Sequence, residues 1–75
     1  MEVNIFKSMS NASKCIVLPV DVDVDESQLA IEDKDYVQVY FLRTRTLSIG
    51  NDNVSFDPAT AIEAIENQGF YLFNV

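Results

Sequence analysis

The chain has little of what enzymes use for catalysis. It contains no histidine, one cysteine and two isolated glycines among its 75 residues. A nucleophilic cysteine normally needs a histidine as its base, and a phosphate-binding loop needs clustered glycines. These absences argue against a Cys–His hydrolase and against a nucleotide-binding loop. We therefore expect a protein that is not an enzyme and that binds no cofactor.

Positive charge is also scarce. Five Lys and Arg residues face twelve Asp and Glu residues, which gives a net charge of −7 and an isoelectric point of about 4.1. Since affinity for nucleic acid depends on Lys and Arg that neutralise phosphates, we expect no direct nucleic-acid binding.

Long hydrophobic runs are missing as well. No stretch approaches the roughly 20 apolar residues of a membrane span, and the start of the chain lacks the basic and apolar parts of a signal peptide. We expect a cytoplasmic protein with no membrane contact. Cys15 lies in an apolar run and cannot form an internal disulfide, so it is read as a small buried hydrophobe.

The residues that are present predict a single α+β domain over residues 1–75. Hydrophobic residues make up 48% of the chain, and β-branched and aromatic runs separated by polar turns indicate a mostly antiparallel sheet of four or five strands. The expected strands span residues 2–7, 14–18, 36–42, 46–49 and 70–73, with a possible return strand at 54–56. The run 36–42 is β-branched and aromatic throughout with only Gln38 polar, so we expect it to be central in the sheet.

One main helix is expected at about 57–68, packed on one face of the sheet. Asp57 is a typical N-cap, Pro58 fits the first helical position, and Phe56 can pack onto Ala61 as a hydrophobic staple. Gly69 fits the left-handed position after the helix. Contact between Phe70 and Ile65 would complete a Schellman ending.

Residues 20–35 carry most of the negative charge and have an ambiguous local pattern. Valine alternates with aspartate over residues 20–25, as on a strand, whereas a cap-like Asp25 followed by Gln28 favours a short helix. We favour the helix. Seven of the twelve acidic residues gather here, and only Lys34 offsets them: Asp21, Asp23, Asp25, Glu26, Glu32, Asp33 and Asp35.

The acidic stretch is our candidate partner-binding site. Clustered carboxylates raise the rate of encounter with a basic protein surface, and alternate aspartates on a strand lie about 7 Å apart, near the spacing of successive phosphates. Plain solubility is the alternative explanation, because small domains often carry a net charge of this size.

Calcium binding is a second possibility for the same stretch. Asp21, Asp23, Asp25 and Glu32 occupy positions 1, 3, 5 and 12 of an EF-hand loop. Glu26 stands where the loop needs glycine, and the Val–Asp alternation does not predict an entering helix. We therefore expect no resident metal.

Arg43-Thr44-Arg45 is the main basic cluster. On a strand both arginines would point the same way and could bind a phosphate or a carboxylate. An exposed edge, or ion pairs with the chain's own acids, would explain the pair equally well.

Two segments resemble the YcgL family of small bacterial proteins of unassigned function. The start Ile5-Phe6-Lys7-Ser8 is similar to that family's Ile-Tyr-basic-Ser, and 68–72 is similar to its Gln-Gly-aromatic-aromatic-Leu. The middle of this chain departs from the family, and the family's proline-rich exit is missing. The resemblance implies a mixed α/β fold, no known activity and no site residues.

The expected function is that of a small acidic protein-binding module. In one concrete form it is an inhibitor of the kind that phages encode, a nucleic-acid mimic that occupies the basic groove of a partner protein. The alternatives are a YcgL-like housekeeping domain with an unknown ligand and a weak Ca²⁺-binding protein.

The EF-hand resemblance gives a first test. Without glycine at position 6 and without an entering helix, we expect no Ca²⁺ site tighter than about 10⁻³ M, the weak end of the EF-hand range. Calorimetry at low salt measures this. Micromolar binding that is abolished by Glu32→Gln would contradict it.

Overall fold

A computed structural model describes residues 1–22, 31, 33–48 and 56–75 of the chain. The elements are β1 (Glu2–Ser8), β2 (Lys14–Pro19), the 3₁₀ turn η1 (Lys34–Tyr36), β3 (Val39–Thr46), α2 (Pro58–Gln68) and β4 (Tyr71–Asn74). The strands form one antiparallel sheet in the order β3-β1-β2-β4. The predicted α+β class is confirmed, with four strands and one α-helix in the described part of the chain.

The β1–β2 hairpin forms the centre of the sheet, as the strands expected at 2–7 and 14–18 predicted. Residues 9–13 connect the two strands, and Ile5 pairs with Val17 in the ladder. Cys15, Ile16, Val17 and Leu18 are all buried. Because successive side chains of a strand point to opposite faces, β2 needs a cover on both sides of the sheet.

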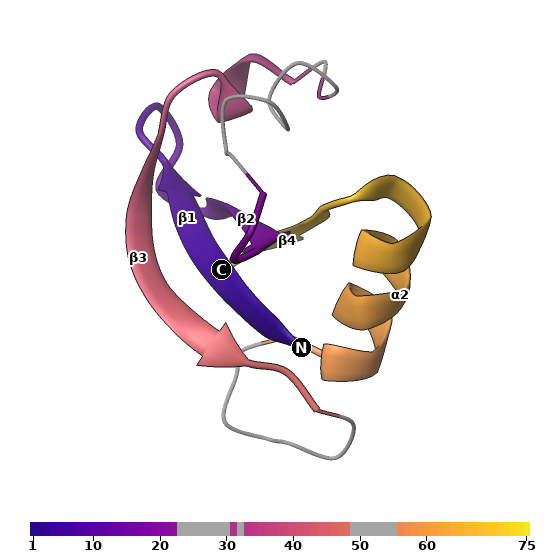
Figure 1. The fold of residues 1–75 in the computed structure, drawn as a ribbon. Helices are drawn as coiled ribbons and strands as arrows, with labels where there is room; N and C mark the ends of the chain where they lie inside the picture. The colour runs from indigo at the N-terminus through magenta and orange to yellow at the C-terminus, as the bar shows by residue number, and fades with distance from the viewer. Residues whose placement is uncertain (23–30, 32, 49–55) are drawn as a thin grey trace.

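Two clusters provide those covers. On one face α2, which Figure 1 shows lying beside the sheet, packs Ala61 and Ile65 against residues of β1 and β2. The buried members of this cluster are Val3, Ile5, Val17, Leu47, Ala61 and Ile65. On the other face Tyr36 of η1 packs with Ile16 and Leu18. The prediction that the helix covers one face is confirmed, and η1 contributes to the cover of the second face.

The start of α2 agrees with the sequence. Asp57 is the N-cap, and its carboxylate accepts hydrogen bonds from the Ala59 amide (3.3 Å) and the Thr60 hydroxyl (2.6 Å). Pro58 is the first helical residue. Phe56 packs against the cluster that contains Ala61, as the staple predicted.

The end of α2 agrees only in part. Gly69 has φ 91°, and its amide donates to the Ile65 carbonyl at 2.8 Å, which is the single bond of the simpler left-handed ending. Phe70 packs in the Tyr36 cluster, on the face of the sheet away from Ile65. The predicted contact between Phe70 and Ile65 is therefore wrong, because Phe70, which immediately precedes β4, packs on the opposite face of the sheet.

The strand expected at 36–42 is displaced and is not central. β3 begins at Val39 and forms an edge of the sheet, while Tyr36 belongs to η1 and is 3% exposed. Tyr40 and Phe41 are 44% and 55% exposed. Aromatic and β-branched residues suit an edge strand as well as a central one, so the composition misled the prediction.

The strand expected at 46–49 is also wrong as a separate element over residues 46–48, and residue 49 lies outside the described part of the chain. Thr46 ends β3, and Leu47 then leaves the ladder, although its amide still donates to the Met1 carbonyl at 2.7 Å. The expected helix after Asp25 and most of the return strand at 54–56 lie outside the described residues.

A β-bulge divides β3. Ile5 of β1 pairs with Arg43, whereas the next residue, Phe6, pairs with Phe41, so Leu42 is the extra residue. A bulge shifts the alternation of faces by one residue. Tyr40, opposite Lys7, therefore shares the α2 face with Arg43.

No helix in the described ranges is long and apolar enough to span a membrane.

The helix ending gives a prediction on stability. A Cβ at Gly69 would meet no atom within 4 Å, so the effect of Gly69→Ala comes from the positive φ alone. We expect a loss of about 1 kcal/mol in the free energy of unfolding, measured as a lower denaturant midpoint. An unchanged or higher midpoint would show that this residue does not occupy the left-handed region.

Candidate functional site

The acidic candidate residues are only partly visible in the structure. Asp21, Asp33 and Asp35 lie in the described part of the chain, whereas Asp23, Asp25, Glu26 and Glu32 lie outside it. Asp21 is exposed just after β2. The structure therefore shows only the two ends of the acidic stretch that the sequence predicts, Asp21 at its start and Asp33 and Asp35 at its end.

Lys14 binds both acidic residues that flank η1. Its Nζ lies 2.6 Å from Asp33 Oδ2 and 3.0 Å from Asp35 Oδ2. Hydrogen bonds from Lys14 lower the pKa of both carboxyls below the usual range, and the two carboxylates in turn raise the pKa of Lys14. Sequence reasoning missed this partner because Lys14 lies far from Asp33 along the chain, in β2.

Further polar contacts extend this ion-pair cluster. The Asp35 carboxylate also accepts hydrogen bonds from the Ser10 hydroxyl at 3.1 Å and from the Asn11 side-chain amide, Nδ2, at 3.5 Å. The buried Ser8 hydroxyl donates to the Asp35 carbonyl and accepts from the amides of Ser10 and Asn11. Together these contacts join the β1–β2 loop to η1, so Asp33 and Asp35 have a structural task in addition to any role in binding.

The described acids do not form a metal site. In residues 1–22, 31, 33–48 and 56–75, no group of three or more Cys, Asp or Glu side chains comes close enough to ligate one ion. Three of the four EF-hand positions, Asp23, Asp25 and Glu32, lie outside these ranges. Weak Ca²⁺ binding therefore stays a prediction.

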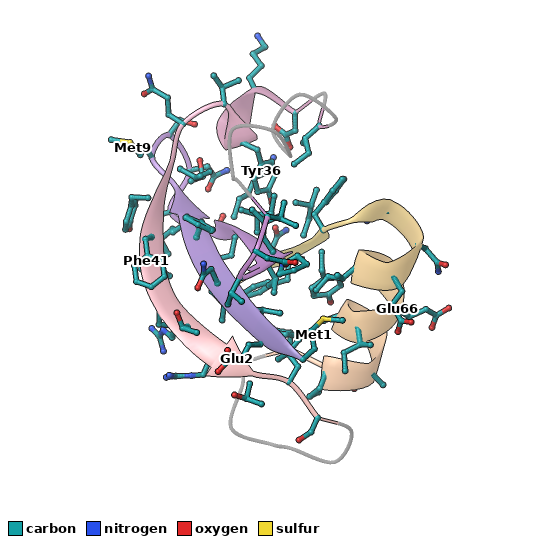
Figure 2. The ribbon with its side chains drawn as sticks, viewed as in Figure 1. Met1, Glu2, Met9, Tyr36, Phe41 and Glu66 are labelled. Carbon is teal, nitrogen blue, oxygen red and sulfur yellow. The ribbon has the colours of Figure 1, made fainter. Side chains whose placement is uncertain are left out.

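Large apolar side chains are exposed at one end of β3 and beside it. Met9 and Val37 are each 64% exposed, and Tyr40 and Phe41 of β3 are exposed as well. Figure 2 shows Met9 and Phe41 on the outer, β3 side of the sheet. Met9 is joined to this region through its amide, which donates to the Gln38 carbonyl at 2.9 Å. We call these four residues the β3-edge patch.

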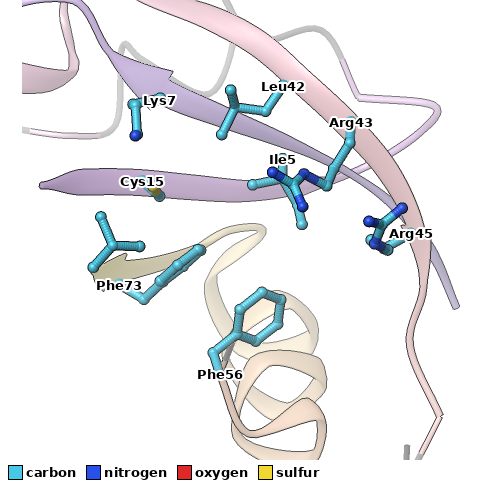
Figure 3. A pocket seen from close by; sticks show the side chains of 9 residues that line it. Ile5, Lys7, Cys15, Leu42, Arg43, Arg45, Phe56 and Phe73 are labelled. Carbon is cyan, nitrogen blue, oxygen red and sulfur yellow. The ribbon is translucent and has the colours of Figure 1, made fainter. Parts of the chain in front are cut away.

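A cavity of about 190 Å³ opens on the α2 face of the sheet, beside the part that the helix covers (Figure 3). Strands β1, β2, β3 and β4 all contribute to it. Its apolar walls are Ile5, Leu42, Phe56, Phe73 and Val75, and the Phe56 and Phe73 ring centroids lie 4.7 Å apart.

Three cations line the same cavity: Lys7 of β1 and Arg43 and Arg45 of β3. The prediction that both arginines point the same way is confirmed, and the register explains it, because Arg43 and Arg45 pair with Ile5 and Val3 on the α2 face. Lys7 was missed because its place beside them depends on the strand pairing.

Cys15 lines the cavity and is 1% exposed. Burial raises the pKa of its thiol, although the nearby charges of Lys7 and Arg43 act in the opposite direction. A thiol of raised pKa is a poor nucleophile at neutral pH. Cys15 therefore serves as a neutral wall of the cavity, in line with its reading as a buried hydrophobe.

The Lys14 cluster predicts how stability depends on pH. A carboxyl whose pKa is lower in the folded state contributes stability above its unfolded pKa, about 3.9 for aspartate, and this stability is lost as the pH falls through the folded value. We therefore expect Lys14→Met to lower the urea midpoint at pH 6 and to narrow its difference from wild type as the pH falls below about 4.

Lys34→Met is the matched control. Lys34 is an exposed lysine in η1, between Asp33 and Asp35, and no ion pair with either of these described residues is found. Its midpoint should follow the wild-type pH profile. A Lys14→Met deficit of the same size at every pH would show that Lys14 does not stabilise the two carboxylates.

Searches against family models, curated proteins and solved structures find no match to this chain. What it does must therefore be inferred from the geometry of its own residues.

Proposed function

We propose that this chain is a small non-enzymatic protein-binding module that recognises a basic partner protein. The contact is made by the β3-edge patch, and the negative charge of the module steers the encounter. The exposed aromatic side chains of β3, on an edge that pairs with no strand of the described residues, are the observation that carries the proposal.

The position of β3 in the sheet supports an interaction through its backbone. β3 pairs with β1 on one side and with no strand of the described residues on the other. An unpaired edge is a template for a strand of another chain, and proteins usually protect it with charge or proline. Arg43 and Arg45 protect the second half of β3. Residues 39–42 contain no charge and no proline, so this half is open to a partner.

The side chains around the open half supply apolar area. Burying one large apolar side chain stabilises a fold by about 1.5–3 kcal/mol, and a 75-residue domain has few such groups to spare. Leaving Val37, Tyr40 and Phe41 exposed gives up that stabilisation in the isolated chain. A protein partner that covers them would recover it, and tyrosine is a frequent anchor residue in interfaces.

Charge supplies the preference for a basic partner. η1, which carries Asp35 and follows Asp33, comes just before β3 in the chain and lies near the start of that strand (Figure 1). Lys14 and Lys34 together balance the charges of Asp33 and Asp35, so the negative charge of this proposal comes from the other acids of the stretch. The proposed acidic surface further includes Asp21, Asp23, Asp25, Glu26 and Glu32. Such a field raises association rates at low salt.

One specific form of this proposal is an inhibitor that occupies a basic groove otherwise filled by nucleic acid. The overall charge of −7 favours it. A YcgL-like housekeeping domain with its own small ligand is the second candidate, and the cavity beside β3 is the observation that favours it.

The proposal predicts that edge and charge variants fail in different ways. Immobilised wild type should retain a basic protein from a cell lysate, and less of it as salt rises. With that partner purified, Val37→Ser/Tyr40→Ser should mainly raise the dissociation rate, by about tenfold or more, because buried apolar contact is lost. Asp21→Asn should mainly lower the association rate at low salt.

Val20→Ser is the matched control, since Val20 is a 44% exposed valine that follows β2, away from the edge. It should leave both rates unchanged. If the double variant unfolds at the wild-type midpoint and binds with wild-type rates, β3 is not the contact. If the chain instead pairs only with itself through β3, the proposed basic partner is wrong.

A further inference from the structure

We infer that the cavity on the α2 face is a binding site for a small anion that carries one apolar ring, such as an aromatic phosphate or carboxylate. This goes beyond the proposed protein-binding function, because the cavity lies on the face of the sheet and the proposed partner binds its edge. Either inference can fail without the other.

The fold leaves room for such a ligand. One helix of 11 residues packs against a four-stranded sheet, and the cavity opens over Ile5 and Cys15, beside the contacts of α2 with the sheet. A cavity of about 150 Å³ lined by apolar side chains is known to hold benzene. The 190 Å³ here therefore suit one ring together with a compact charged group.

The walls suit the two parts of this ligand separately. Phe56 and Phe73 form an aromatic wall, with ring planes tilted by 40°, against which a further ring can pack. Arg43 and Arg45 extend from the opposite side, from β3 (Figure 3). Their guanidinium groups have the planar fork that binds a carboxylate or phosphate through two parallel hydrogen bonds.

The distribution of charge over the whole chain strengthens the inference. The protein has only five Lys and Arg residues, and three of them line this one cavity: Lys7, Arg43 and Arg45. The ion pairs found in the described ranges are both made by Lys14. No carboxylate side chain of the described residues forms an ion pair with Lys7, Arg43 or Arg45.

None of the three cations lies directly opposite another in the β1–β3 ladder, but like charges gathered around one small cavity still repel one another. A bound anion would replace that repulsion by charge-assisted hydrogen bonds. Solubility does not explain the arrangement, since twelve acidic residues already give the chain a large net charge. Cys15 supplies a neutral wall, and no covalent step is involved.

Phenyl phosphate is the probe for the test, because it joins one ring to one dianionic group. In a ¹H–¹⁵N spectrum we expect saturable shifts at Ile5, Cys15 and Phe73, with a dissociation constant of about 1 mM or tighter for a ligand of this size. Benzyl alcohol, which has the ring without the charge, and inorganic phosphate, which has the charge without the ring, should each bind at least tenfold more weakly.

Arg43→Gln should weaken phenyl phosphate about tenfold and leave the benzyl alcohol shifts unchanged. Lys34→Gln is the matched control, since it removes one exposed cation outside the cavity, and it should leave the affinity within about twofold. Because Arg43 is exposed, its replacement should alter stability little, and the dispersion of the spectrum checks the fold of each variant.

Three results would overturn the inference. The first is the absence of saturable shifts at the cavity with 10 mM phenyl phosphate, about tenfold above the expected dissociation constant. The second is inorganic phosphate binding as tightly as phenyl phosphate, which would mean a general anion patch. The third is an equal loss of affinity in Arg43→Gln and Lys34→Gln, which would mean that only net charge matters.

Discussion

The two-sided burial of β2 is the constraint on which the rest of the structure depends. Cys15 and Val17 face α2, whereas Ile16 and Leu18 face Tyr36 and its neighbours. A chain of 75 residues must therefore cover both faces of one sheet with few residues outside the strands. The α-helix covers part of one face, and a single 3₁₀ turn with one buried tyrosine contributes to the other. The Tyr36 hydroxyl donates to the Cys15 carbonyl at 3.3 Å, which ties that cover to the central strand.

The small number of covering residues explains the positions of the cavity and of the β3-edge patch. Because α2 covers only part of its face, a cavity is left over the β1–β3 side of the sheet. Because β1 and β2 occupy the centre, β3 is left at the edge with its aromatic side chains exposed. Four of the five cations of the chain lie on one or the other covered face of the sheet. Lys14 fastens η1 to the hairpin, whereas Lys7, Arg43 and Arg45 surround the cavity.

The sequence predicted the features that depend on near neighbours in the chain. Asp57 and Gly69 mark the helix ends through local hydrogen bonds and backbone conformation, so both could be read without knowing the fold. The features it missed depend on pairing across the sheet. Lys14 meets Asp33 only because β2 lies against η1, and Lys7 joins the two arginines only through the β1–β3 register. The prediction that 36–42 is a central strand was wrong because an apolar composition does not show whether a strand has a neighbour on one edge or on both.

The bulge at Leu42 has a consequence of its own. It makes β3 behave as two short strands joined end to end, in which odd-numbered residues of the second half and even-numbered residues of the first half face α2. A substitution at Arg43 or Arg45 therefore changes the cavity and leaves the direction of the Tyr40 and Phe41 side chains as it is. A substitution at Tyr40 or Phe41 likewise leaves the direction of the two arginines as it is. Natural selection, or a protein engineer, can alter one of these surfaces while the other keeps its orientation.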